Sequence, residues 1–283
     1  KFANIPELMQ MYKEFADIQT ADMIKLPVPE IKSGKPQIIT AKPDDFQKAY
    51  MKILAERSED IHNGKVEPTV DNMLKITHAA RLLGLDSRCI SPEAVPAPDS
   101  KVNLLLENLE KIYHETNEQK GVQIVFCDIA INENDGKFSV YEAIKADLIK
   151  HGIPEKEICF AGDAKTDKAR AEMFEQLRQG EKRFILASTS KLGTGANIQN
   201  KVCAIHHLDI PWKPSDLEQQ NGRGIRQGNS FSEVGIYHYV TEETFDAYML
   251  GIITNKAKFI GQVMTSKEPA RTCEDVDEMV LTY

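Results

Sequence analysis

The sequence has no apolar run long enough to cross a membrane and no signal peptide at its start. Its five cysteines are odd in number, scattered and without C-x-x-C spacing, so they do not describe a disulfide framework. We therefore expect reduced thiols and a cytoplasmic protein with no membrane partner. The chain begins with Lys1 rather than methionine, from which we expect a piece of a longer protein.

The sequence also has no excess of basic over acidic residues. Lysine and arginine number 35 against 43 aspartate and glutamate residues, which leaves a formal charge of −8. This balance argues against a surface that is basic all over, but it is compatible with one local basic groove for nucleic acid. Hydrophobic residues at 41% and charged residues at 28% are typical of a globular protein.

The segment 1–98 is predicted to be a mostly helical linker. Apolar residues recur at helical spacing in three stretches, and a short β-like run and a proline-rich end lie between and after them. The expected helices cover 4–18, 44–61 and 71–83, the β-like run covers 37–40, and the prolines lie within 91–98.

The segment 99–250 has a different pattern, in which apolar, β-branched strands alternate with helices. This pattern predicts an α/β domain with a parallel sheet covered by helices on both faces. Ligands bind beyond the carboxyl ends of such strands, so we expect a site in the loops after Cys127, Ala187 and Leu208. A C-terminal helix and an acidic tail are expected over 251–283. The expected strands are 122–127, 158–160, 183–187, 202–208 and 234–240.

A helix is predicted to begin near Asp216, because Ser215 and Glu218 have the spacing of a capping box. Two glycines follow, Gly222 and Gly224, and each costs about 1 kcal/mol relative to alanine inside a helix. Glycines at that cost indicate that another part of the protein packs very close to this backbone.

Three long polar side chains share one face of this predicted helix. Gln219, Arg223 and Arg226 are spaced i, i+4 and i+7. Guanidinium groups match the oxygen atoms of phosphates, so this face could form an anion clamp for a polyphosphate. A solvated arginine face with weak ion pairs is the alternative.

A second polar stretch follows the expected strand at 183–187. Ser188, Thr189 and Lys191 precede a loop that contains Gly193 and Gly195. Hydroxyl groups, a lysine and freed backbone amides could together hold a phosphate of a nucleotide or of a nucleic-acid strand. An ordinary strand-to-helix turn is the alternative.

In their order along the chain, these stretches resemble motifs V and VI of superfamily 2 helicases, most nearly those of the Swi/Snf-type remodelling ATPases. The order is a strand, S-T-x-x-x-G-x-G-x-N, a second strand, D-x-P-W-x-P, and then Q-x-x-G-R-x-x-R-x-G. A weaker likeness, around Asp71 and Leu85-Asp86, is to large helicase–methylase proteins of phages and mobile elements.

The resemblance implies a RecA-like fold and a role as the second motor lobe of an ATP-dependent DNA helicase or translocase. The sequence has neither G-x-x-x-x-G-K-[ST] nor D-E-x-[DH], so ATP with Mg²⁺ would be bound mainly by an upstream RecA-like lobe, and this chain alone is predicted to be inactive. DNA would be held through its backbone with little sequence specificity. The resemblance assigns arginine fingers to Arg223 and Arg226, ATP binding to Gln219, Gly193 and Gly195, DNA contacts to Ser188, Thr189, Lys191 and Asn197, and structural support to Asp209 and Trp212.

Two other classes of protein remain open. Asp209-Ile-Pro-Trp212 resembles the D-P-P-W motif of adenine-specific DNA methyltransferases, although isoleucine replaces the first proline. A non-catalytic RecA-like scaffold that binds DNA or a protein is the other alternative. Trp212 could stack on DNA or brace motif VI, or it could be a buried anchor between Pro211 and Pro214. His206 and His207 are adjacent on a strand, so their side chains should point to opposite faces of the sheet.

Overall fold

The computed structural model describes residues 2–16, 26–131, 137–192, 196–265 and 272–273. None of the helices in these ranges combines the length and the apolar character that a bilayer crossing requires. Short 3-10 helices occur between the main elements, at Lys32–Gly34, Ser87–Cys89, Glu155–Glu157 and Gln199–Lys201.

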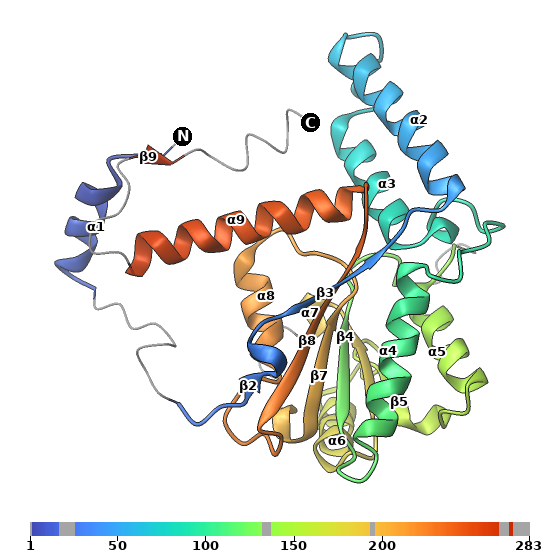
Figure 1. Ribbon diagram of the computed structural model, residues 1–283, viewed down its shortest axis with the longest axis vertical. Coiled ribbons are helices and arrows are strands. Elements are labelled where there is room, and N and C mark those ends of the chain that lie inside the picture. The colour runs from blue at the N-terminus through green and yellow to red at the C-terminus, as the bar shows by residue number, and fades with distance from the viewer. Residues whose placement is uncertain (1, 17–25, 132–136, 193–195, 266–271, 274–283) are drawn as a thin grey trace.

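A parallel sheet forms the centre of the described structure (Figure 1). Its seven strands are joined in the order β2-β8-β7-β4-β6-β5, with β3 also paired to β8. Every pairing within it is parallel, so the carboxyl ends of all the strands lie along one edge. The strands are β2 (Glu30–Ile31), β3 (Gln37–Ala41), β4 (Val122–Phe126), β5 (Ile158–Phe160), β6 (Phe184–Ala187), β7 (Val202–His207) and β8 (Glu233–Thr241).

The edge of the sheet beside β8 comes from the segment that the sequence assigns to the linker. The β-like run expected at 37–40 lies in β3, whose Ile39 is paired with Tyr239 of β8. The shorter strand β2 pairs with the beginning of β8. Residues 30–41 therefore extend the same sheet as the segment 99–250.

Helices cover both faces of the sheet, as the sequence predicts. On one face, α4 (Lys101–Glu115) and α5 (Val140–Lys150) bury Leu105, Leu109 and Ile144 against the strands. On the other face lie α6 (Asp167–Gln179) and α7 (Thr189–Leu192). Burying the strands on both sides explains why they are nearly continuous apolar runs.

A helical hairpin extends beyond the carboxyl ends of the strands (Figure 1). It consists of α2 (Asp45–His62) and α3 (Met73–Leu85), packed around Leu54, Ile76 and Leu83. The hydroxyl of Thr241, at the end of β8, donates to the carbonyl oxygen of Gly84 at 2.7 Å. This hydrogen bond joins the end of α3 to the end of the sheet.

The remaining elements lie on the side of the sheet that carries β8. They include α9, which packs on α8 through Met249 and Ile253. At the start of α9, Asp246 forms a buried ion pair with Lys101 of α4. Both charges are buried there, so removing either residue would leave the other charge unpaired in the interior and destabilise the fold. These elements are α1 (Ile5–Lys13), α8 (Pro214–Asn221), α9 (Phe245–Thr265) and a small ribbon of β1 (Phe2–Ala3) with β9 (Thr272–Cys273).

Three histidines are buried in the middle of the sheet. His206 lies 2.9 Å from the Tyr239 hydroxyl, whereas His207 lies on the opposite face and stacks on His238 at 4.6 Å. The prediction that the two adjacent histidines face opposite ways is confirmed. Burial lowers the pKa of His206 to about 3, that of His207 to about 4 and that of His238 to about 3.

We expect these histidines to make the fold labile in acid. An unfolded chain binds protons at histidine near pH 6.5, but the folded chain keeps all three rings neutral down to about pH 4. Each histidine should therefore lower the free energy of unfolding by up to about 1.4 kcal/mol per pH unit as the pH falls from 6.5 to 4. Urea denaturation at several pH values measures this slope.

The variant His206→Gln should reduce the slope by up to about 1.4 kcal/mol per pH unit, which is the contribution of one proton. His62→Gln is the matched control, because His62 is exposed. An unchanged slope in His206→Gln would contradict the assignment of the acid sensitivity to the buried rings.

Candidate functional site

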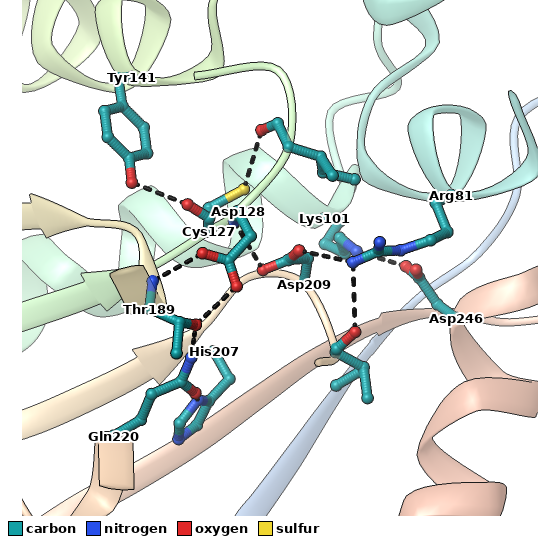
Figure 2. A network of polar contacts seen from close by, with 12 residues as sticks. Arg81, Lys101, Cys127, Asp128, Tyr141, Thr189, His207, Asp209, Gln220 and Asp246 are labelled. Atoms are coloured by element: carbon teal, nitrogen blue, oxygen red, sulfur yellow. Dashed lines mark hydrogen bonds and ion pairs between the residues drawn. The ribbon is translucent and has the colours of Figure 1, made fainter. Parts of the chain in front are cut away.

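The three loops that the sequence singles out meet at the carboxyl ends of neighbouring strands. Asp128 follows β4, Thr189 follows β6 and Asp209 follows β7, and their side chains belong to one polar network (Figure 2). The order β7-β4-β6 in the sheet brings them together, because the three strands are direct neighbours. This is the position at which open parallel sheets bind ligands.

The carboxylate of Asp128 holds Thr189 through two hydrogen bonds. The backbone N–H of Thr189 donates to Oδ1, and its hydroxyl donates to Oδ2, both at 2.6 Å. Charge-assisted hydrogen bonds of this length are among the stronger ones in proteins. The first turn after β6 is therefore fixed to the end of β4.

A second set of contacts joins Thr189 to α8. The buried side chain of Gln220 donates from Nε2 to the Thr189 hydroxyl oxygen at 2.7 Å. Its Oε1 lies 2.8 Å from Nδ1 of His207, whose Nε2 lies 2.9 Å from Oδ1 of Asn221. Gln220 thus bridges the β6 loop and the end of β7.

Asp209 is the most deeply buried carboxylate of the network. Its Oδ1 accepts from the backbone N–H of Asp128 at 3.1 Å, and its Oδ2 accepts from Arg81 of α3 at 3.0 Å. Burial and the charge of Asp128 raise the pKa of Asp209 to about 6, against the opposing effect of Arg81 and Lys101. The helical hairpin therefore contributes the countercharge for a site residue.

Trp212 lies at the outer end of this network. The guanidinium carbon of Arg81 lies 5.3 Å from the centre of the indole ring, and the ring of Phe245 is 6.2 Å away. Trp212 is 39% exposed, so the interpretation as a buried anchor between two prolines is wrong. The hydrogen bond from Arg81 to Asp209 holds the guanidinium group over the Trp212 ring, where the two form a cation–π contact.

The helix α8 differs from its prediction at both ends. Lys213 is the N-cap residue and Pro214 begins the helix, so the predicted capping box of Ser215 and Glu218 is not formed. Proline is well suited to the first helical position, so the helix begins two residues earlier than predicted. The helix ends at Asn221 with Gly222 as its C-cap.

The predicted helical face of Gln219, Arg223 and Arg226 is consequently wrong, since both arginines follow the end of the helix. The structure nevertheless brings the three residues together. Nη1 of Arg223 donates to the carbonyl oxygen of Ala196 at 2.8 Å, and Nη1 of Arg226 approaches the same oxygen at 3.5 Å. Nε of Arg223 donates to the backbone carbonyl of Gln219 at 3.2 Å. We call these three residues the arginine cluster.

Two positive charges lie close together in the arginine cluster. Burial, followed by the charge of Arg226, lowers the pKa of Arg223. The carbonyl oxygen of Ala196, a neutral group, lies within hydrogen-bonding distance of both guanidinium groups. Such a pair favours the binding of an anion.

The other residues expected at the site surround the segment after β6. Ser188 is buried, with its hydroxyl 3.0 Å from that of Ser190, whereas Lys191 and Asn197 are exposed. The carbonyl oxygen of Asn197 accepts from Arg178 of α6 at 2.9 Å. The expected glycines of this loop, Gly193 and Gly195, lie outside the described residues.

Three residues of the site were missed at the level of the sequence: Arg81, Asp128 and Gln220. Asp128 directly follows a predicted buried strand, and Gln220 lies inside the Q-x-x-G-R-x-x-R stretch. The position of each residue in the sequence could therefore have identified it as a candidate for the site. Arg81 belongs to a segment 128 residues before its partner Asp209, and no local pattern relates the two. In the part of the chain that the structure describes, no group of three or more histidine, cysteine, aspartate or glutamate side chains could hold a metal ion.

Part of the chain is similar to a known protein family. Residues 101–228 match the family model of the helicase conserved C-terminal domain. "Defense against restriction protein B" of Escherichia phage P1 is 31% identical over 96 residues, which are 34% of this chain. "Uncharacterized ATP-dependent helicase YqhH" of Bacillus subtilis (strain 168) is 25% identical over 176 residues, which are 61% of this chain. The chain spans 4% of the first relative and 30% of the second.

Among solved structures, the crystal structure of the C-terminal part of the Fun30 ATPase domain superposes with a TM-score of 0.62. The alignment covers 91% of this chain and 97% of that one, at 12% sequence identity, which establishes a common fold. The parallel sheet with its covering helices is therefore a RecA-like α/β fold. The family match covers residues 101–228, and the fold that the chain shares with the Fun30 structure agrees with it.

The close packing predicted for the glycines is found at Gly224. A Cβ atom there would lie 2.9 Å from Cγ1 of Val202 and 3.1 Å from Cδ1 of Ile205. We expect Gly224→Ala to lower the free energy of unfolding by about 1–3 kcal/mol, because the turn that carries the arginines must move away from the sheet. Urea denaturation measures the change.

Gly251→Ala is the matched control, since apart from the adjoining backbone of α9 itself no atom lies within 4 Å of the corresponding Cβ. This exchange should leave the fold as stable or add up to about 1 kcal/mol, through the higher helix propensity of alanine. Equal effects of the two substitutions would contradict the packing role of Gly224.

Proposed function

We propose that this chain is the second motor lobe of an ATP-dependent DNA helicase or translocase. In this proposal the arginine cluster acts on ATP, and the segment after β6 contacts the DNA backbone. The match of residues 101–228 to the helicase conserved C-terminal domain, together with the shared fold, supports the assignment to a helicase or translocase. The convergence of Arg223 and Arg226 on one carbonyl oxygen supports the assignment of the arginines.

The arginine cluster suits a triphosphate in charge and in donor geometry. Arg223 and Arg226 would supply guanidinium donors to the γ-phosphate, and Gln219 would contribute a further polar contact. ATP bound with Mg²⁺ supplies the phosphoryl group that is transferred to water. An arginine placed against the transferred group accelerates comparable reactions by about 10³–10⁵.

DNA would be contacted along α7 and at the end of the following loop. Lys191 and Asn197 are exposed there, and Ser188 lies at the carboxyl end of β6. A lysine and short polar side chains suit contacts with phosphates, which carry no base sequence. We therefore propose binding with little sequence specificity, which one local patch permits in a chain of net charge −8.

The nucleotide would be bound mainly by another RecA-like lobe of the same polypeptide. This chain contains no G-x-x-x-x-G-K-[ST] and no D-E-x-[DH], the motifs that hold phosphates and magnesium in such motors. Movement of the two lobes toward each other would bring Arg223 and Arg226 to the nucleotide and couple hydrolysis to movement along DNA. The isolated chain is accordingly proposed to be inactive.

We expect Arg226→Ala, in the full-length protein, to lower DNA-stimulated ATP hydrolysis by about 10³-fold or more, because the charge that faces the transferred phosphoryl group is lost. DNA binding should be retained. A coupled assay of ADP release, with and without duplex DNA, measures the rate.

Arg170→Ala, which removes an exposed arginine from α6, is the matched control and should hydrolyse ATP at the wild-type rate. Robust turnover in Arg226→Ala would remove this arginine from the chemistry. If the wild-type protein hydrolyses no ATP with any DNA, the proposed function is wrong and a non-catalytic scaffold is favoured.

A further inference from the structure

The hydrogen bonds of Thr189 leave its donors no freedom to bind a ligand. A hydroxyl group has one proton and two lone pairs. The proton of the Thr189 hydroxyl is directed to Oδ2 of Asp128, one lone pair accepts from Nε2 of Gln220, and the backbone N–H is directed to Oδ1 of Asp128. The side chain therefore lies between two protein partners, Asp128 and Gln220 (Figure 2).

Both partners are themselves held in place. Gln220 is 1% exposed, and its remaining side-chain oxygen faces Nδ1 of His207. The backbone N–H of Asp128 donates to Asp209, which is in turn paired with Arg81 of the helical hairpin. The contacts thus run without interruption from α3, across the ends of β7, β4 and β6, to α8.

The arginine cluster is attached directly to the last member of this network. Gln219 precedes Gln220 in the chain, and the backbone N–H of Arg223 donates to the carbonyl oxygen of Gln220 at 3.1 Å. A displacement of Gln220 would therefore displace Arg223. In catalysis, a misplacement of about 1 Å can cost about 10²-fold in rate.

We propose that Thr189 is a positioning residue, which fixes the arginine cluster for catalysis through Asp128 and Gln220 instead of binding DNA itself. This inference rests on the proposed function. It replaces the direct DNA contact suggested for Thr189 by a structural link between the DNA-facing segment and the nucleotide-facing segment of the lobe. Asp128 and Gln220 share the same role.

The test compares catalysis with DNA affinity in the full-length protein. Thr189→Val keeps the shape of the side chain and removes only the hydroxyl. We expect it to lower kcat for ATP at saturating duplex DNA by about 10- to 100-fold. The Kd for DNA, measured by fluorescence anisotropy, should stay within about twofold of the wild-type value.

Thr189→Ser, which restores a hydroxyl at the same place, should recover most of the rate. Thr254→Val is the matched control, because it removes a hydroxyl from an exposed threonine of α9 and should leave kcat unchanged.

A double-mutant cycle tests whether Thr189 and Gln220 act as one unit. Gln220→Met should lower kcat to the same extent as Thr189→Val, and the double variant should be no slower than either single one, since both remove the same link. Additive losses would overturn the proposal. If thermal denaturation shows that Thr189→Val does not fold, Asp128→Asn carries the same test, because it keeps the side-chain shape but removes the charged acceptor.

Two outcomes separate this inference from the function on which it rests. A wild-type protein with DNA-stimulated hydrolysis and a Thr189→Val variant with weaker DNA binding, but normal kcat at saturating DNA, would overturn the inference alone. A wild-type protein without DNA-stimulated hydrolysis would overturn the proposed function and the inference together.

Discussion

The carboxylate of Asp209 is buried just after the end of β7, and it constrains the positions of the segments that meet at the carboxyl edge of the sheet. A buried charge without partners costs several kcal/mol, so this group needs donors that the strand itself cannot supply. One donor comes from the neighbouring strand, as the backbone N–H of Asp128, and the other comes from Arg81 of the helical hairpin. The position of the hairpin over the sheet and the position of Asp128 beside Thr189 both satisfy this requirement.

The architecture follows from patterns that are local in the sequence. Apolar runs such as Phe184–Ala187 are separated by amphipathic helices, and a parallel sheet covered on both faces is the arrangement that buries them. The same reasoning places the site beyond the strand ends, because every strand points the same way. Adjacent residues on a strand alternate in direction, which is why the opposite orientations of His206 and His207 could be predicted.

Side-chain partners are less accessible to such reasoning. The prediction of one helical face for Gln219, Arg223 and Arg226 depends on a helix that continues, whereas α8 ends at Asn221 and a turn carries the arginines. Their meeting at Ala196 is a tertiary contact, produced by a loop from another strand. Arg81 was missed for the same reason, since the order of the strands and the docking of α3 decide which carboxylate it reaches.

The edge strand β3 has a consequence for where this lobe can be divided. The family match begins at residue 101, after β3, yet β3 covers the outer side of β8 over Tyr237–Thr241. A protein trimmed to the matched segment plus β8 would uncover the backbone N–H and C=O groups along one side of this buried, nine-residue strand. Open edges of that length pair with strands from other molecules. Residues 30–41 thus protect this edge of the sheet from pairing with another molecule, and they belong to the same folded unit as β8.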